Sequence, residues 1–191
     1  MARPRAFDTE VAVDQAMHLF REHGYHATPV PRLTARLGIG TGSLYAAFGS
    51  KDGLYARALE RYCDGLIAAL DRDVRLGPDT RTALHALLMA MADADAADPE
   101  HGCLLVSAAT ERSAHEGTIE RVRTAMTEAE TVLTAALRAA RDRGELRDGQ
   151  HPEELARFLT TFIQGIRVMG RARVGREFLE SAVAGALRAL D

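Results

Sequence analysis

Apolar residues recur every three to four positions along most of the chain, which is the spacing of amphipathic helices. Residues typical of strands are sparse, whereas Ala, Arg, Leu and Glu dominate the sequence. The pattern predicts an all-α fold of about nine helices. Two short helices are expected on either side of Gly38. The other seven are expected at about residues 8–23, 51–76, 79–97, 103–112, 116–143, 152–173 and 175–190.

The two short helices lie in residues 28–52 and are joined by a tight glycine turn. Thr28 is expected to cap the first of them, and Pro29 and Pro31 fit its first turn, where a missing N–H removes no intrahelical bond. One set of residues is apolar and can close the inside of the unit: Val30, Leu33, Leu37, Ile39, Leu44 and Phe48. A second set is polar and is expected to point outward: Thr28, Arg32, Thr41, Ser43, Tyr45 and Lys51.

The helix after Gly38 carries little side-chain bulk before its aromatic residues, so its backbone could approach another surface closely. Its small residues are Gly40, Gly42, Ser43, Ala46 and Ala47. A supporting helix, a tight turn and a slim second helix are typical of a helix-turn-helix, whose second helix lies in the DNA major groove. The segment therefore predicts binding to double-stranded DNA.

This segment also resembles the DNA-binding region of TetR-family transcriptional regulators. The resemblance is carried by residues 20–25 and 37–39, by Gly42-Ser43-Leu44-Tyr45 with Phe48, and by Ser50-Lys51-Asp52. It extends over about residues 9–60, and the rest of the chain fits the family only in its helical layout. It implies a helix-turn-helix DNA-binding domain at residues 1–50 and a ligand-binding and dimerisation domain at residues 51–191.

The resemblance also implies DNA contacts for individual residues. Thr28, Tyr45 and Lys51 would contact phosphate, whereas Thr41, Gly42 and Ser43 would face base edges. The sequence departs from the usual family pattern at Thr41, where a lysine is common, and at Pro31, where a polar residue is usual. Base recognition would then depend on a thymine methyl group and on Arg32 or Ser43.

The net charge of −3 does not exclude a nucleic-acid partner, because the charges are distributed unevenly. Residues 1–60 carry seven Arg or Lys against six Asp or Glu, whereas the remainder carries seventeen against twenty-one. A locally basic DNA-binding domain on a slightly acidic body suits a sequence-specific regulator.

The last two predicted helices carry apolar and small residues that could pack against a second copy of the chain. In the family such a pair forms a four-helix dimer interface, which implies a homodimer on a palindromic operator. The interface residues expected are Phe158, Ile163, Phe178, Ala182, Val183 and Leu187. Packing within a single chain is the alternative.

The helices after residue 51 are expected to enclose an apolar cavity for a small effector. Its expected walls include Leu66, Leu87, Met91, Cys103, Met126 and Phe162. Cys103 also lies in a segment, 101–106, that resembles a branch of the family in which some members sense electrophiles or oxidants. A helix N-terminus and the nearby His101 would favour its thiolate. A small buried apolar role for Cys103 stays open.

No other chemistry is indicated by the sequence. Cys63 and Cys103 are too few and too far apart for a disulfide framework, and the scattered histidines give no metal spacing, so no metal or cofactor is expected. No apolar run approaches the ~20 residues that span a bilayer, which predicts a cytoplasmic protein without membrane contact. A small helical enzyme and a helical protein adaptor remain alternatives, but no nucleotide loop or nucleophile elbow supports an enzyme.

Overall fold

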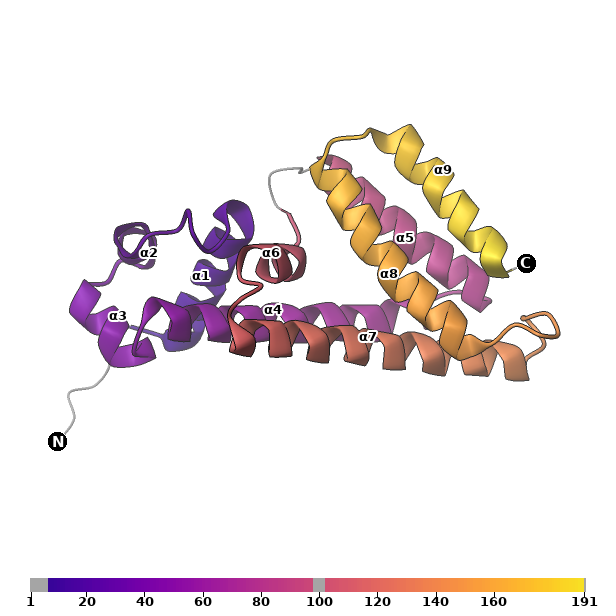
Figure 1. The fold of residues 1–191 in the computed structure, drawn as a ribbon, viewed down its shortest axis with the longest axis horizontal. Helices are drawn as coiled ribbons and strands as arrows, with labels where there is room; N and C mark the ends of the chain where they lie inside the picture. The colour runs from indigo at the N-terminus through magenta and orange to yellow at the C-terminus, as the bar shows by residue number, and fades with distance from the viewer. Residues whose placement is uncertain (1–6, 98–101, 191) are drawn as a thin grey trace. The chain divides into compact units, whose positions relative to one another are not determined.

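The computed structural model describes residues 7–97 and 102–190, and these residues form nine α-helices, one 3₁₀ turn and no strand (Figure 1). The predicted all-α fold is confirmed for this part of the chain. The helices are α1 (Thr9–His23), α2 (Val30–Leu37), α3 (Thr41–Phe48), α4 (Lys51–Asp73), α5 (Thr80–Ala97), α6 (Leu104–Glu111), α7 (Glu116–Asp142), α8 (Pro152–Arg171) and α9 (Arg176–Leu187).

Most helix ends fall close to their predicted positions, because the residues that cap and break helices are plain in the sequence. Asp8 caps α1 by accepting the N–H groups of Glu10 and Val11 at 2.8 and 3.4 Å. At the other end of the chain α9 stops at Leu187, three residues early, and residues 188–190 tighten into a 3₁₀ turn.

Thr28 does not cap α2, and that prediction was wrong. Pro29 occupies the cap position without a side-chain hydrogen bond. The Thr28 hydroxyl instead donates to the carbonyl of Gly24 at 2.6 Å, because a threonine hydroxyl can bond backward to a carbonyl four residues earlier.

The described residues form two compact units that do not follow the expected division at residue 50. The first combines residues 7–64 with 103–122, and the second combines residues 65–102 with 123–190, residues 98–101 apart. Helices α4 and α7 contribute residues to both units. The first unit therefore includes α6, which begins at Leu104, far along the chain from the end of α3 at Phe48.

The core of the first unit is aromatic at its centre. The rings of Phe20 and Tyr55 lie 4.9 Å apart in an edge-to-face arrangement, and the Tyr25 ring lies 5.0 Å from Tyr55. Such pairs add about 1 kcal/mol each beyond the burial of their area. Leu33 and Leu44 bring α2 and α3 onto this core, where both are completely buried.

The second unit has an aliphatic core between α5 and the two last helices. Helix α5 packs against α8 and α9, and the three lie side by side in Figure 1. The core residues from these helices include Leu84, Leu88, Leu159, Ile163, Ile166, Leu179, Val183 and Leu187. Burying each aliphatic side chain contributes about 1.5–3 kcal/mol.

Candidate nucleic-acid interface

Helices α2 and α3 meet at Gly38, which adopts the left-handed conformation that a side chain disfavours. Its φ and ψ are 64° and 29°, and the N–H groups of Gly38 and Ile39 both donate to the carbonyl of Thr34. This arrangement ends α2 sharply and allows α3 to begin three residues later at Thr41. The predicted helix-turn-helix is confirmed in its local geometry.

The N-terminus of α3 is open to a ligand. Gly40 stands at its cap position with no side-chain hydrogen bond to the first turn, so the first N–H groups are available to an acceptor. Thr41, Gly42 and Ser43 are all exposed, and no Cβ or long side chain covers the backbone at Gly42. A helix end of this kind attracts anions such as phosphate, because its N–H groups carry partial positive charge.

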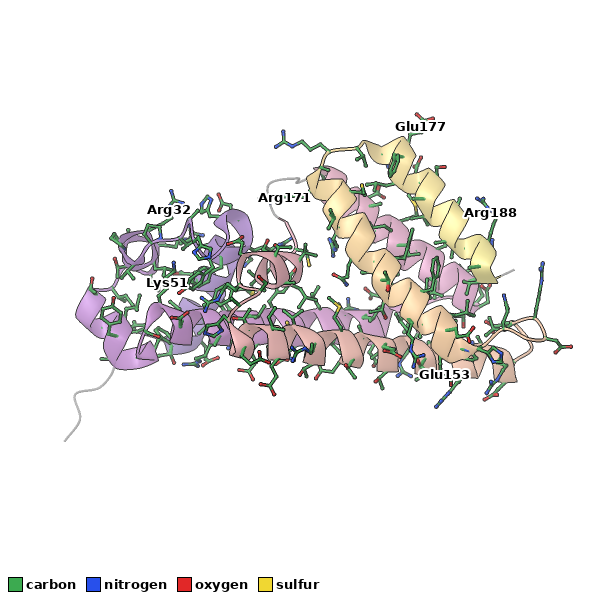
Figure 2. All side chains as sticks on the ribbon, viewed as in Figure 1. Arg32, Lys51, Glu153, Arg171, Glu177 and Arg188 are labelled. Atoms are coloured by element: carbon green, nitrogen blue, oxygen red, sulfur yellow. The ribbon has the colours of Figure 1, made fainter. Side chains whose placement is uncertain are left out.

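Two larger side chains extend this exposed face. Tyr45 is 45% exposed on α3, which is a large exposed fraction for an aromatic side chain. Arg32 is exposed on α2 and is held in place by donating to the carbonyl of Ala27 at 3.2 Å; Figure 2 shows it directed away from the ribbon. These residues, with Thr41, Gly42 and Ser43, are called the exposed face of α2 and α3 below.

Thr28 and Lys51 do not lie on this face as the sequence predicted. Thr28 has no exposed surface, since its hydroxyl is used on Gly24. Lys51 is half-buried: its ammonium donates to the carbonyl of Tyr25 at 2.6 Å and lies 3.9 Å from the centre of the Tyr25 ring. Figure 2 places Lys51 among the side chains of the unit. Burial, and then the charge of Arg112, lowers its pKa.

A charged cluster behind the exposed face was not predicted from the sequence. Arg112, whose side chain is only 6% exposed, pairs with Asp52 at 2.6 Å and stacks 3.7 Å from the centre of the Tyr25 ring. The Tyr25 hydroxyl donates to the same carboxylate at 2.8 Å. Cation and ring attract each other strongly when both are removed from water. The cluster therefore fixes the start of α4 against the segment that leads into α2.

The cluster shifts the pKa of each of its acids. The hydrogen bond from Tyr25, and then the Arg112 guanidinium, hold the pKa of Asp52 below its usual value. Burial, followed by the hydrogen bond to Asp52, raises the pKa of Tyr25. Burial alone would lower the pKa of Arg112, but Asp52 and Tyr25 outweigh it and raise that pKa. At neutral pH the carboxylate and the guanidinium are both charged, as the ion pair requires.

Glu111, at the end of α6, binds the segment that follows α1. Its carboxylate accepts the N–H groups of Tyr25 at 2.9 Å and His26 at 3.4 Å, while its carbonyl lies 3.2 Å from the His26 ring nitrogen. The residue before this segment is a glycine, Gly24, because a Cβ there would overlap the Glu111 carboxylate. The only sequence signal for these contacts was the pair Glu111-Arg112 at the end of an apolar helix. Charged residues at such a position are usually exposed to solvent, so the sequence did not indicate the contacts.

The expected effector-binding residues are divided between the two units. Leu87 is buried in α5, and Leu66, Met91, Met126 and Phe162 are partly buried in the second unit. A pocket of about 360 Å³ in that unit has none of them in its lining. Their role as ligand contacts stays a prediction.

Cys103 belongs to the first unit, where it occupies the cap position of α6 and is 7% exposed. Its place at a helix N-terminus is as expected. His101, the proposed neighbour of the thiol, lies outside the described residues. Within the part of the chain that the structure describes, no group of histidine, cysteine and carboxylate side chains could hold a metal ion.

The expected dimer residues fall into two groups. Phe158 on α8 and Phe178 on α9 are 42% and 52% exposed, which is unusual for phenylalanine, and Ala182 is partly buried. Ile163, Val183 and Leu187 instead belong to the core of the second unit, and their part in an interface stays a prediction. On α8 and α9 apolar residues lie on both a buried and an exposed face. The spacing of apolar residues alone does not tell which of the two faces the core and which could face a second copy.

Comparison with known proteins identifies both parts of the chain. Residues 12–58 match the family described as bacterial regulatory proteins, tetR family, and residues 80–186 match the family described as tetracyclin repressor-like, C-terminal domain. The transcriptional repressor ComR of Escherichia coli is 32% identical over 97% of this chain and 90% of its own length.

Solved structures agree with this match. A cysteine mutant of the TetR-family regulator CifR, in complex with a 26-base-pair operator, has 32% identity and a TM-score of 0.87 over the whole of both chains. The reduced form of NemR from E. coli has the same fold at 20% identity, with a TM-score of 0.84 over 96% of this chain and 98% of its own. No described helix is long and apolar enough to cross a membrane.

Proposed function

Because the chain belongs to the tetR family of bacterial transcriptional regulators, which are DNA-binding proteins, we propose that it represses transcription as a homodimer on a palindromic operator and that a small molecule releases it. The observation that carries the proposal is the exposed face of α2 and α3, where a slim, uncapped helix N-terminus lies beside Tyr45 and Arg32. A regulator of bacterial genes is expected to act in the cytoplasm.

Each residue of the exposed face suits a particular DNA contact. The N–H groups at the start of α3 and the Tyr45 hydroxyl can donate to phosphate oxygens, which position a protein without reading sequence. Thr41 and Ser43 carry short hydroxyl side chains that can donate to or accept from base edges, and the Thr41 methyl group can contact a thymine methyl. We propose Arg32 as a further phosphate or base contact. Buried Thr28 and half-buried Lys51 would support this face from behind.

The exposed phenylalanines on α8 and α9 support the homodimer. Phe158 stacks on Phe162 at 5.9 Å between ring centres, and Phe178 lies on the neighbouring helix α9. A second copy covering these rings would remove apolar area from water, which favours association by roughly 25 cal/mol per Å². Two copies related by a two-fold axis would bring two exposed α3 helices to the DNA, which is why the proposed operator is palindromic.

Selection from a pool of randomised duplexes by the purified protein tests the repressor proposal. We expect a palindrome to be enriched. The affinity for that duplex, measured by fluorescence anisotropy, should fall steeply with salt and remain well above the affinity for scrambled DNA. Ser43→Ala is expected to weaken discrimination between sequences without unfolding the protein, because Ser43 is exposed. Failure to enrich any sequence would reject the proposal.

A thiol sensor on the same scaffold is a second candidate, and the position of α6 favours it. Cys103 precedes the helix whose last turn carries Glu111 and whose C-terminal cap is Arg112, and both hold the segment that leads into α2. Addition of an electrophile to the buried Cys103 sulfur would leave no room for the adduct and displace α6. We expect an electrophile such as N-ethylmaleimide to weaken operator binding of the protein and of Cys63→Ser, but not of Cys103→Ser. Equal sensitivity of Cys103→Ser would exclude this route.

A further inference from the structure

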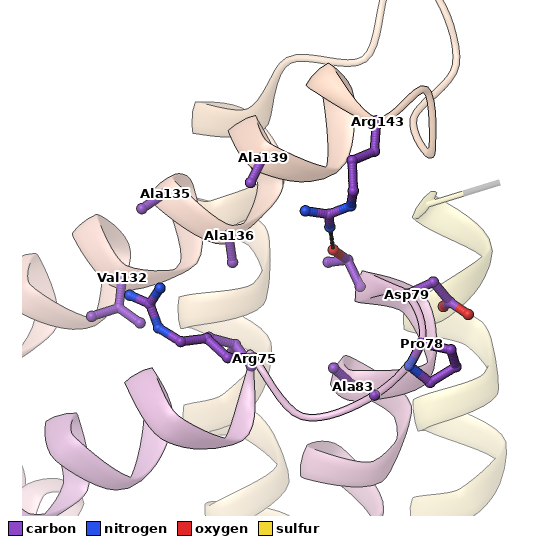
Figure 3. A pocket seen from close by; sticks show the side chains of 12 residues that line it. Arg75, Pro78, Asp79, Ala83, Val132, Ala135, Ala136, Ala139 and Arg143 are labelled. Atoms are coloured by element: carbon purple, nitrogen blue, oxygen red, sulfur yellow. Dashed lines mark hydrogen bonds between the residues drawn. The ribbon is translucent and has the colours of Figure 1, made fainter.

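The second unit contains a pocket that the proposed function does not explain. It lies where the end of α4, the loop to α5, the start of α5 and the second half of α7 meet, and its volume is about 360 Å³ (Figure 3). This is within the size range of sites for small organic molecules, at its lower end. Every lining residue belongs to the second unit, and none was predicted from the sequence to bind a ligand.

One wall of this pocket is a row of short apolar side chains on α7. Val132, Ala135, Ala136 and Ala139 follow each other at the spacing of one helix face, and Ala83 and Pro78 add apolar surface from the other side. The eight residues from Val132 to Ala139 extend over about 10 Å of helix. The row therefore offers a narrow, elongated apolar surface rather than a compact one.

Two arginines lie at the ends of this row. Figure 3 shows the guanidinium of Arg75 at the Val132 end and that of Arg143 at the Ala139 end. Arg75 uses Nε and Nη2 on Asp71, and Arg143 uses Nε on Glu145 and Nη2 on Thr80. Among the described residues neither Nη1 group has a hydrogen-bond partner, so each arginine is held in place with donors to spare.

The wall that carries Arg143 is fixed before any ligand binds. Glu145 pairs with Arg143 and accepts the N–H of the buried Thr80 at 2.9 Å. The hydrogen bond from Arg143, more than any other contact, lowers the pKa of Glu145 to about 2, so the carboxylate stays ionised at neutral pH. A guanidinium held in this way loses little conformational freedom on binding a ligand.

Each arginine of the lining is already paired with a carboxylate, Arg75 with Asp71 and Arg143 with Glu145, so what the lining offers an anion is their unused N–H donors. Asp79 is the one carboxylate of the lining among the residues described, and both its oxygens accept from Thr82, at 2.7 Å from the N–H and 2.9 Å from the hydroxyl. The charged groups with unused donors are then Arg75 and Arg143. A carboxylate is the group that matches the planar guanidinium best, and an aliphatic chain matches the alanine row.

We propose that this pocket binds an aliphatic carboxylate, with the carboxylate on an arginine and the chain along Val132 to Ala139. The inference rests on the proposed function, since it assigns a chemical class to the effector that would release the protein from DNA. It places that effector away from the cavity that the sequence predicted. The arginine and the alanine row make separate contributions that can be removed one at a time.

Isothermal titration of the full-length protein with sodium octanoate, without DNA and at two temperatures, tests the site. We expect one octanoate per chain and binding of octan-1-ol at least about tenfold weaker, because the alcohol lacks the charge-assisted hydrogen bond. The double variant Arg75→Gln, Arg143→Gln should weaken octanoate about tenfold, whereas Arg141→Gln, on an exposed arginine of α7 outside the lining, should bind like the parent protein. Equal binding of octanoate and octanol would overturn the anion site.

Filling the pocket is the second arm of the test. Ala139 is exposed within the lining, so Ala139→Leu should fold normally and abolish octanoate binding, while Ala90→Leu, exposed on α5 outside the lining, should change nothing. Absence of octanoate binding in the parent protein, or its survival in a folded Ala139→Leu, would overturn the proposal. Because no DNA is present, these outcomes are separate from a failure to bind an operator.

Discussion

At the scale of single residues, Arg112 is a buried charge that depends on one carboxylate and two aromatic rings. Its guanidinium pairs with the Asp52 carboxylate. It also lies 3.7 Å from the centre of the Tyr25 ring and 5.1 Å from the centre of the Tyr55 ring. Removing the Asp52 carboxylate would leave the Arg112 charge without an anion in a place that excludes water. This costs more stability than breaking an exposed ion pair does. The half-exposed Asp52 moderates this cost.

Asp52→Asn is expected to lower the free energy of unfolding by about 1–2 kcal/mol at pH 7, because Arg112 loses its counter-charge. The pKa of Asp52 is depressed in the folded protein, so its contribution is complete above the unfolded value and is lost as the pH falls through the folded one. Urea unfolding of both proteins between pH 7 and pH 3 should therefore show a difference that shrinks on acidification. A difference that grows toward low pH would contradict this account, and Asp93→Asn, in an ion pair with Arg176 in which both side chains are about half exposed, is the control.

Gly24 and Gly38 both have positive φ, yet substitution should affect them differently. Gly38 is in the left-handed helical region, which other residues adopt at moderate cost, whereas Gly24, with φ 80° and ψ 176°, is in a region that is almost exclusive to glycine. A Cβ at Gly24 would also displace the Glu111 carboxylate from the N–H groups it accepts. We expect Gly24→Ala to cost about 2–3 kcal/mol and Gly38→Ala about 1 kcal/mol in urea unfolding. Equal costs would mean that Glu111 does not stabilise this segment.

At the scale of helices, the sequence predicted the features that depend on residues close together along the chain. The positions of α2 and α3 follow from Gly38, from Leu33 and Leu44, and from the small residues near Gly42, all within a few residues of each other. The contacts of Lys51 with Tyr25, and of Glu111 with the segment that follows α1, join residues far apart in the sequence, and periodicity carries no information on such pairs. This is why Lys51 was placed outward, whereas Thr28 was misplaced because its hydroxyl bonds backward to Gly24 instead of capping α2.

Tyr45→Phe tests the outer face of α3 without touching its inner face. Tyr45 is half-exposed, so the change should leave the free energy of unfolding within about 0.5 kcal/mol. Loss of a hydroxyl that donates to a phosphate should weaken binding to the selected operator about tenfold. The weakening should be similar for specific and scrambled DNA, because a phosphate contact carries no sequence information. An unchanged affinity would remove Tyr45 from the interface.

At the scale of the whole molecule, the account requires two chains on one operator. Phe178→Asp places a charge on an exposed position of α9 and is expected to give folded monomers in light scattering, whereas Val183→Asp should unfold the protein because Val183 is completely buried. Phe178→Leu, which keeps an apolar surface, should remain dimeric. If Phe178→Asp remained a dimer with its helical content intact, the interface would have to lie on another surface.

Fluorescence anisotropy on the selected palindrome, with the protein at known concentration and Tyr45→Ala beside it, tests the central claim most directly. The account predicts saturation at two chains per duplex, an affinity at least a hundredfold above that for scrambled DNA, and a loss of about tenfold or more in Tyr45→Ala. Equal affinity for palindrome and scrambled DNA, or an affinity for the palindrome that Tyr45→Ala leaves unchanged, would contradict a sequence-specific repressor that reads DNA with α3.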